Sequence, residues 1–190
     1  MVVLRKTLVA ALMALMVLIG VLAPAAPASA QAAGEYDVKA AFLYNFAKFV
    51  EWPSNAFDAP GSPMTLCIVG KDPFGEALDT LVRGETLQGR PMTIHRTRDL
   101  LEIRDCHVVF LSRMETGRQD EVLDTVRGVG ILTVGEGDSF LRDGGIIRFV
   151  IEANRVRFEV NLDAAERNGL KLSSKLLRLA RSVQPAGYGG

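Results

Sequence analysis

Two cysteines and two histidines are the side chains in this sequence best suited to covalent or metal chemistry. Cys67 lies in the apolar stretch MTLCIVG, and Cys106 stands at the start of CHVVFL, so both belong to or border predicted strands. Two thiols in an oxidising compartment favour a disulfide, while two buried free thiols or a redox-sensitive pair are the alternatives. His95 and His107 are isolated, and the spacing of the four residues matches no usual zinc site. We therefore expect a cross-link and no metal centre.

Motifs for nucleotide binding or hydrolysis are absent from the sequence. It contains no Walker loop, GxGxxG fingerprint, GxSxG elbow or HExxH. The carboxylates are spread over predicted helices and turns, and His107 begins an apolar strand, where a structural role is the usual one. We therefore expect a binding or regulatory domain that is not an enzyme and needs no cofactor. A hydrolase would require folding to bring dispersed carboxylates together with His95 or His107.

The first thirty residues predict export. A short basic segment precedes an apolar run at 7–23, and Ala28-Ser29-Ala30 has the small-x-small pattern of a cleavage site. An uncleaved anchor helix is the alternative, because a run of about 17 residues is near the lower limit for spanning a bilayer. We expect a signal peptide at 1–30 and one periplasmic domain at 31–190.

The charge balance argues against nucleic acid as a partner. The chain carries 22 basic and 22 acidic residues, and two of the basic ones belong to the predicted signal peptide. A nearly neutral domain has no electrostatic footprint for nucleic acid. The same balance argues against attachment to an anionic membrane by charge alone.

The order of the predicted elements indicates an α/β fold. Apolar runs at 64–69, 107–112 and 129–135 predict buried strands, and helical patterns separate them, which favours a parallel or mixed sheet covered by helices. Alternating residues around Ala153-Asn154 predict a β-hairpin. We expect one domain with a mixed sheet of about five to six strands, helices packed on it, and a C-terminal β-hairpin followed by helix.

The first predicted helix, which Pro53 should end, carries an aromatic stripe. Its apolar positions recur with a helical period and include Val38, while Lys39 lies off the stripe. We expect this face to pack on the sheet through Phe42, Phe46, Phe49 and Val50. Tyr44 and Trp52 lie away from the stripe and are candidates for a partner surface, because aromatic residues are enriched in interface hot spots.

Two further helix starts or faces can be predicted. Asp72 before Pro73 has the pattern of an N-cap followed by proline at the first helical position. In the last predicted helix, Leu172, Leu176 and Leu179 share a face, and we expect them in the core. The polar residues of that segment could hold an anionic ligand or partner, with a solvated face as the alternative: Lys171, Ser173, Ser174, Lys175 and Arg178.

Three blocks of the sequence closely resemble the YfiR family of periplasmic proteins. They are YDVKAAFLYNFAKFVEWP, GRPMTIHRTRDLLEIRDCHVVFLS and GGIIRFVIEANRVRFEVNLDAAERNGLKLSSKLLRLA, and the resemblance covers about residues 35–181. It implies a repressor that binds the periplasmic sensing domain of an inner-membrane diguanylate cyclase and keeps cyclic di-GMP and biofilm formation low. It also implies sequestration by an OmpA-like outer-membrane lipoprotein, and it is compatible with a homodimer.

The resemblance also bears on the cysteines. Cys67 in LCIVG and Cys106 in DCHVVFL match a cysteine pair of the family, whereas the second pair of its best-known member has no counterpart here. A second function stays open beside the repressor, namely a periplasmic small-molecule-binding module that reports to a histidine kinase or a transporter.

Overall fold

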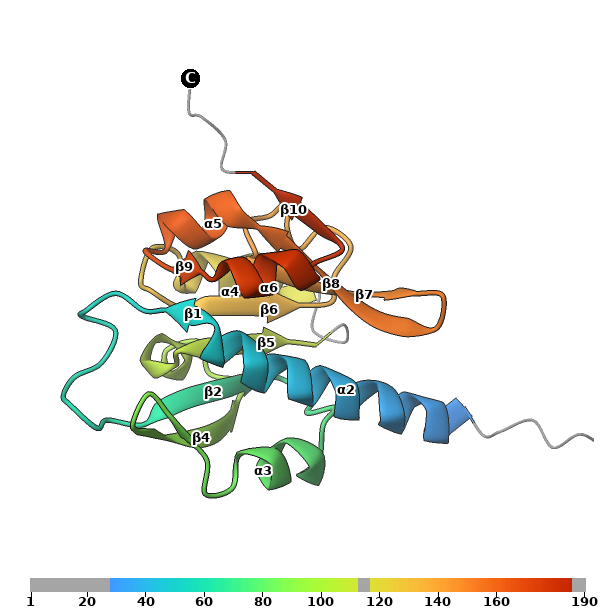
Figure 1. Cartoon of the computed structure of the whole chain (residues 1–190), viewed down its shortest axis with the longest axis horizontal. Coiled ribbons are helices and arrows are strands. Elements are labelled where there is room, and N and C mark those ends of the chain that lie inside the picture. Colours follow the sequence, from blue (N-terminus) through green and yellow to red (C-terminus); the bar gives the residue numbers. More distant parts are fainter. Residues whose placement is uncertain (1–27, 113–116, 186–190) are drawn as a thin grey trace, which may run out of the picture. The chain divides into compact units, whose positions relative to one another are not determined.

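The computed structural model of the chain describes residues 28–112 and 117–185 (Figure 1). The chain divides into a unit of residues 1–32 and a unit of residues 33–190, and the fold described below is that of the second unit. Among the described residues, no helix combines the length and the apolar character needed to cross a bilayer. The predicted signal peptide lies, except for its last three residues, outside the described part and stays a prediction.

A mixed sheet of eight strands forms the centre of the domain, in the order β10-β8-β7-β6-β5-β2-β4-β3. Strands β2, β4, β5, β6 and β7 run parallel, β8 returns antiparallel to β7, and β10 pairs parallel to β8. The bounds are β2 (Met64–Val69), β3 (Thr86–Leu87), β4 (Arg90–Thr97), β5 (Val108–Leu111), β6 (Leu132–Gly135), β7 (Ile147–Glu152), β8 (Arg155–Asn161) and β10 (Ser182–Gln184). The α/β prediction is confirmed, with more strands than expected.

Short elements complete the domain. A second, two-stranded sheet pairs β1 (Val50–Glu51) with β9 (Lys171–Leu172). The helices are α2 (Ala28–Lys48), α3 (Glu76–Val82), the 3-10 turn η1 (Glu102–Asp105), α4 (Gln119–Thr125), α5 (Leu162–Arg167) and α6 (Ser174–Leu179). The predicted C-terminal helical region is therefore two short helices, α5 and α6, with β9 between them.

The aromatic stripe of α2 packs on one face of the sheet, as predicted. Phe46 is buried, and its ring lies 5.6 Å from that of Phe149 and 4.8 Å from that of Phe158, while Phe42 and Phe49 are half-buried against the same core. Figure 1 shows α2 lying across the sheet. A second apolar cluster on the other face contains the two cysteines and the buried residues of α4.

Three details of the helical predictions were wrong. Val38 is 45% exposed, whereas Lys39 is buried. Helix α2 ends at Lys48, five residues before Pro53, because the chain turns into β1 to pair with β9. Asp72 does not cap α3, since its Oδ1 accepts the backbone N–H of Phe74 at 2.7 Å and the helix begins after Gly75.

The predicted turn of the C-terminal hairpin is confirmed. Ala153 and Asn154 connect β7 and β8 with positive φ angles of 46° and 62°. Two consecutive positive φ values define a type I′ turn, which suits the right-handed twist of paired strands. Asn tolerates this region, but the Cβ of Ala makes it unfavourable.

We expect Ala153→Gly to raise the free energy of unfolding by about 0.5–1 kcal/mol, because glycine adopts positive φ without a steric penalty. Urea denaturation of residues 31–190 would measure the change. Asn154→Gly is the matched control and should have a smaller effect. A lower denaturation midpoint for Ala153→Gly would contradict this account of the turn.

Candidate functional site

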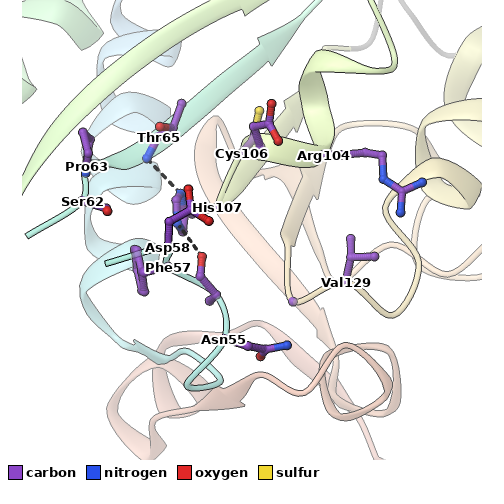
Figure 2. A pocket seen from close by; sticks show the side chains of 13 residues that line it. Asn55, Phe57, Asp58, Ser62, Pro63, Thr65, Arg104, Cys106, His107 and Val129 are labelled. Atoms are coloured by element: carbon purple, nitrogen blue, oxygen red, sulfur yellow. Dashed lines mark hydrogen bonds between the residues drawn. The ribbon is translucent and has the colours of Figure 1, made fainter. Parts of the chain in front are cut away.

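A cavity of about 310 Å³ lies at the amino ends of the parallel strands β2 and β5 (Figure 2). Its walls come from the connector before β2, the first residues of β2, the segment entering β5 and the turn before β6. The polar side chains that line it are Asn55, Asp58, Ser62, Thr65, Arg104, Asp105 and His107. One cationic and two acidic side chains therefore surround a space large enough for a small polar molecule.

His107 ties the wall of the cavity together. Its Nδ1 accepts the backbone N–H of Thr65 at 3.1 Å, which requires the proton to be on Nε2. Nε2 then donates to the carbonyl oxygen of Ala56 at 2.9 Å. The imidazole is therefore a neutral connector between β2 and the 53–63 segment, with both ring nitrogens occupied.

Aromatic and cationic contacts fix the same segment. The ring of Phe57 stacks on His107 at 4.3 Å, and the guanidinium carbon of Arg90 lies 3.8 Å from the centre of the Phe57 ring. Arg90 also donates to the carbonyl oxygens of Ala59 at 2.9 Å and Ser62 at 3.1 Å. The 53–63 segment is thus held by strand β4 as well as by His107.

Burial lowers the pKa of His107, and the nearby charge of Arg90 lowers it further. The carbonyl of Ala56 and the carboxylate of Asp58 act in the opposite direction, but burial is the largest effect. The folded state therefore favours the neutral ring. In the unfolded chain the histidine takes up a proton near pH 6.5. His107 thus contributes stability above about pH 6.5, and that contribution is lost as the pH falls toward the lower pKa of the folded state.

Thermal unfolding between pH 8 and pH 5 tests the contribution of His107 to stability. Wild type should lose up to about 1.4 kcal/mol more stability per pH unit below pH 6.5 than His107→Asn, whose amide cannot be protonated there. The variant should start lower at pH 7, because it loses the stacked ring. In the difference between the two curves of stability against pH, the titration of carboxylates common to both proteins cancels. Parallel curves would argue against a neutral, structural His107.

The disulfide prediction is confirmed, since Cys67 in β2 and Cys106 after η1 are bridged with a Cα–Cα distance of 5.9 Å. Both residues are buried, and Cys106 borders the cavity. The bridge therefore joins the central strand β2 to the segment that carries His107.

A buried ion pair at the middle of α2 was not predicted. Lys39 and Glu136 are 2% and 3% exposed, and the Lys39 ammonium pairs with the carboxylates of both Glu136 and Glu35. The hydroxyl of Tyr36 donates to the second oxygen of Glu136 at 3.2 Å, and the ammonium lies 4.4 Å from the Tyr36 ring centre. The i,i+4 spacing of Glu35 and Lys39 was the one local signal. Glu136 follows β6, far away in the sequence.

The two aromatic candidates occupy different environments. The Tyr44 hydroxyl donates to Glu85 at 2.9 Å, which raises the pKa of Tyr44. Trp52 is half-buried, with its ring 6.5 Å from that of Phe57 and 6.1 Å from that of His107. Its Nε1 is buried and has no hydrogen-bond partner within the described ranges. Trp52 therefore packs against two residues that line the cavity. A partner role for Tyr44 or Trp52 stays a prediction.

The polar candidates near the C-terminus lie outside the cavity, and their role as an anion or partner site stays a prediction. Ser173 caps α6, accepting the backbone N–H of Leu176 at 3.3 Å, while Lys171 lies in β9 opposite Glu51. Three are exposed on α6: Ser174, Lys175 and Arg178. None of the five lines the cavity of Figure 2. The core prediction for this segment was wrong for Leu179, which is 62% exposed.

His95 is the second histidine, and it lies on the surface. Its Nε2 is 2.9 Å from Glu102, an exposed carboxylate whose pKa is lowered by the hydroxyl of Thr97 and by His95. In the described ranges, no group of three or more His, Cys, Asp or Glu residues is placed to hold a metal ion. His107 lines the same cavity as Asp58 and Asp105, and both of its ring nitrogens are engaged with backbone groups.

One solved structure shares this fold. A conserved domain protein from Vibrio cholerae O1 biovar El Tor has a TM-score of 0.52 at 9% identity over 78% of this chain and 60% of its own. An ABC domain from Streptococcus pneumoniae, solved in complex with L-Trp, has a TM-score of 0.45 at 9% identity over 64% of this chain and 55% of its own. This chain thus spans less than two thirds of either protein, and the first likeness concerns the fold alone.

The sequence comparison is more specific than the structural one. A family model described as YfiR/HmsC-like matches residues 36–181, which is nearly the whole described domain. The match includes helix α2 from residue 36 onward, the disulfide, the cavity and the C-terminal hairpin with its following helices. The chain therefore belongs to the YfiR/HmsC-like family.

Proposed function

We propose that this protein is a periplasmic repressor that binds the sensing domain of an inner-membrane diguanylate cyclase and thereby lowers cyclic di-GMP synthesis and biofilm formation. The observation that carries the proposal is the family match over residues 36–181. Family membership supports periplasmic regulation of cyclic di-GMP signalling, and the cyclase as direct partner is the further step. The bridged cysteines suit an oxidising compartment.

The mechanism is a shift in the conformational equilibrium of the cyclase. A bound protein can switch off an enzyme only by the difference in its affinity for the inactive and active states. Moving a cyclase from mostly active to mostly inactive requires a preference of about 10⁴-fold. An OmpA-like outer-membrane lipoprotein would reverse the effect by binding the same repressor. A homodimer would present two such surfaces.

Deletion of the gene, followed by an assay of cyclic di-GMP, tests the proposal. We expect the level to rise, to return when the wild-type gene is restored, and to stay low when one membrane cyclase is deleted as well. The second deletion names the target. An unchanged level after the first deletion would contradict the repressor role.

The cavity favours one alternative, a small-molecule-binding module that reports to a histidine kinase or transporter. Its volume of about 310 Å³ lies at the lower end of the range of ligand pockets, and its lining carries both charges. A thermal-shift screen of small polar metabolites, with Arg104→Ala as the control variant, tests it. A ligand that stabilises wild type but not the variant would favour this function, and its absence would leave the repressor.

A further inference from the structure

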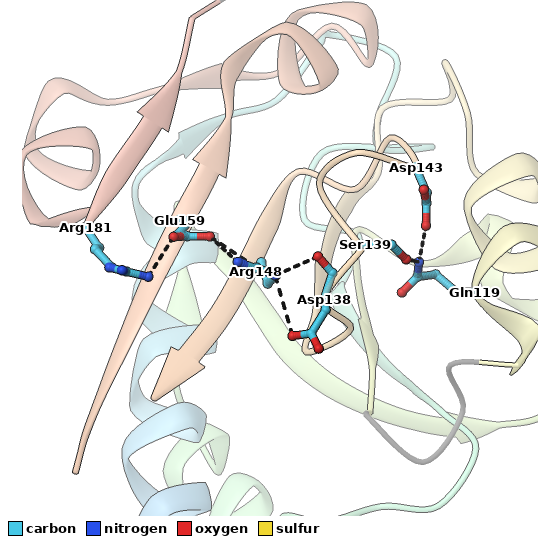
Figure 3. Close-up of polar contacts among 7 residues, drawn as sticks. All are labelled: Gln119, Asp138, Ser139, Asp143, Arg148, Glu159 and Arg181. Carbon is cyan, nitrogen blue, oxygen red and sulfur yellow. Dashed lines mark hydrogen bonds and ion pairs between the residues drawn. The ribbon is translucent and has the colours of Figure 1, made fainter. Parts of the chain in front are cut away.

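The solvent-facing side of the β7–β8 hairpin carries several charged side chains that form ion pairs within the domain. Glu159 of β8 accepts from Arg148 of β7 at 2.7 Å and from Arg181 at 3.0 Å (Figure 3). Arg148 also donates to the carbonyl oxygen of Asp138 at 2.7 Å, and Arg181 reaches Glu152 at 3.0 Å. These charges therefore have partners within the domain.

Arg155 and Arg157 share this face and have no such partners. Successive side chains alternate along a strand, so Arg155, Arg157 and Glu159 point to the same side. Both arginines are exposed, and within the described ranges no carboxylate lies at ion-pair distance from either. Glu152, opposite Arg155 in the β7–β8 register, is engaged with Arg181. The tip of β8 therefore presents two unmatched positive charges.

The same part of β8 is an open strand edge. Asn161 donates its backbone N–H to Ile146 on the β7 side, whereas the carbonyl of Phe158 accepts from Arg181 on the other side. By alternation, the backbone N–H and C=O of Val156 point away from β7. Strand β10 covers only Glu159–Asn161, and no other described strand pairs with β8 on that side. The main-chain groups of Val156 are thus available for pairing.

The opposite face of the hairpin tip is apolar. Ile151 is 43% exposed and lies opposite Val156, which is half-buried against the core. An extended chain placed beside Val156 would therefore contact apolar side chains on one face and guanidinium groups on the other. That combination matches a peptide with alternating apolar and acidic residues, and it does not match a nucleic acid.

We propose that an extended acidic segment of a partner protein adds to the sheet beside β8, at Arg155–Arg157. Strand addition supplies main-chain hydrogen bonds for affinity and alternating side-chain contacts for specificity. In identifying that partner with the sensing domain of the cyclase, the inference rests on the proposed function. A second copy of this chain fits poorly, since antiparallel pairing of two β8 edges would place like charges opposite each other.

The direct test uses a probe that does not depend on the cyclase. The probe is a synthetic peptide with alternating glutamate and valine, acetylated and amidated at its ends, added to residues 31–190. We expect slower amide exchange at Val156, and no effect from the matching lysine–valine peptide. Unchanged exchange at Val156 with the acidic peptide overturns the inference and assigns the arginines to protection of an edge against aggregation.

Variants separate the charges from the main-chain groups. Arg155→Glu/Arg157→Glu should weaken binding of the labelled acidic peptide at least tenfold, while Arg83→Glu/Arg98→Glu, the same charge change at exposed positions elsewhere, should not. Val156→Pro removes an outward N–H and should abolish binding, while Val156→Thr keeps the N–H and should bind. Equal binding by Val156→Pro and Val156→Thr contradicts strand addition.

The cyclase is then a separate measurement. If the wild-type protein binds the peptide but not the purified sensing domain, the proposed function fails and the edge site stands. If it binds the sensing domain with equal affinity in the Arg155→Glu/Arg157→Glu variant, the function stands and the edge site fails. A wild-type dimer in sedimentation that the double variant disrupts assigns the edge to a second copy and overturns the inference.

Discussion

Removal of the Cys67–Cys106 bridge should lower the free energy of unfolding by about 4 kcal/mol. The bridge closes a segment with a sequence separation of 39 residues, and the chain-entropy account gives about 4 kcal/mol for a loop of this length. Cys67→Ala/Cys106→Ala is the suitable variant, because both sites are buried and a serine hydroxyl there would add a desolvation cost. Urea denaturation of residues 31–190 would measure the loss.

Reductant supplies the control for this prediction. Wild type in a phosphine reductant should approach the midpoint of the double variant, whose own midpoint should not respond. Because both sulfur atoms are buried, reduction of the folded protein should be slow and should accelerate in urea. Equal midpoints for oxidised and reduced wild type would mean that the bridge constrains little. Fast reduction without urea would mean that it can act as a switch.

Local sequence patterns predicted the main strands and the hairpin of this fold, because residues within each element carry its periodic signal. The apolar runs gave β2, β5 and β6, and the alternation around Ala153-Asn154 gave the hairpin. The count of strands was too low for a physical reason. Strands β1, β3, β9 and β10 are two or three residues long and exist because a partner segment lies beside them. Such pairings leave no periodic signal.

Local chemistry misled where two motifs compete for the same residues. Asp72-Pro73 fits a helix N-cap, yet its carboxylate closes a turn onto Phe74, and Gly75 with a φ of 54° separates that turn from α3. The candidate site shows the same limit on a larger scale. The cavity is assembled from four segments between Asn55 and Gly130, so its shape depends on tertiary structure. His107 was correctly assigned a structural role, but its partners could not be predicted.

The burial of Lys39 is the clearest case of a feature that the local sequence pattern could not predict. A helical period places Lys39 beside the apolar stripe, and an unpaired lysine would normally be exposed. It is buried because Glu136, 97 positions away, supplies a carboxylate at the end of β6. The prediction of an apolar face was therefore right for Phe42 and Phe46 and wrong for Val38, which is exposed while the neighbouring Lys39 is buried.

Lys39→Met should lower the free energy of unfolding by about 3–4 kcal/mol, although methionine has a similar length and more favourable burial. The loss arises because Glu136, 3% exposed, would keep its charge without the ammonium that neutralises it. Chemical denaturation of residues 31–190 would measure it. Arg127→Met is the matched control. It breaks an exposed ion pair with Asp124 and should cost less than about 1 kcal/mol.

The double variant Lys39→Met/Glu136→Met separates two explanations of that loss. Either the ion pair itself stabilises the fold, or the single variant loses stability because it leaves one buried charge without its partner. Removing both charges removes the desolvation cost together with the attraction, and buried pairs replaced by apolar residues are often neutral or stabilising. We expect the double variant to recover most of the loss, with a coupling energy of about 2–3 kcal/mol in the cycle. Additive losses would mean that Lys39 and Glu136 act independently, through Glu35 and Tyr36, and that the buried pair is not the unit of stability.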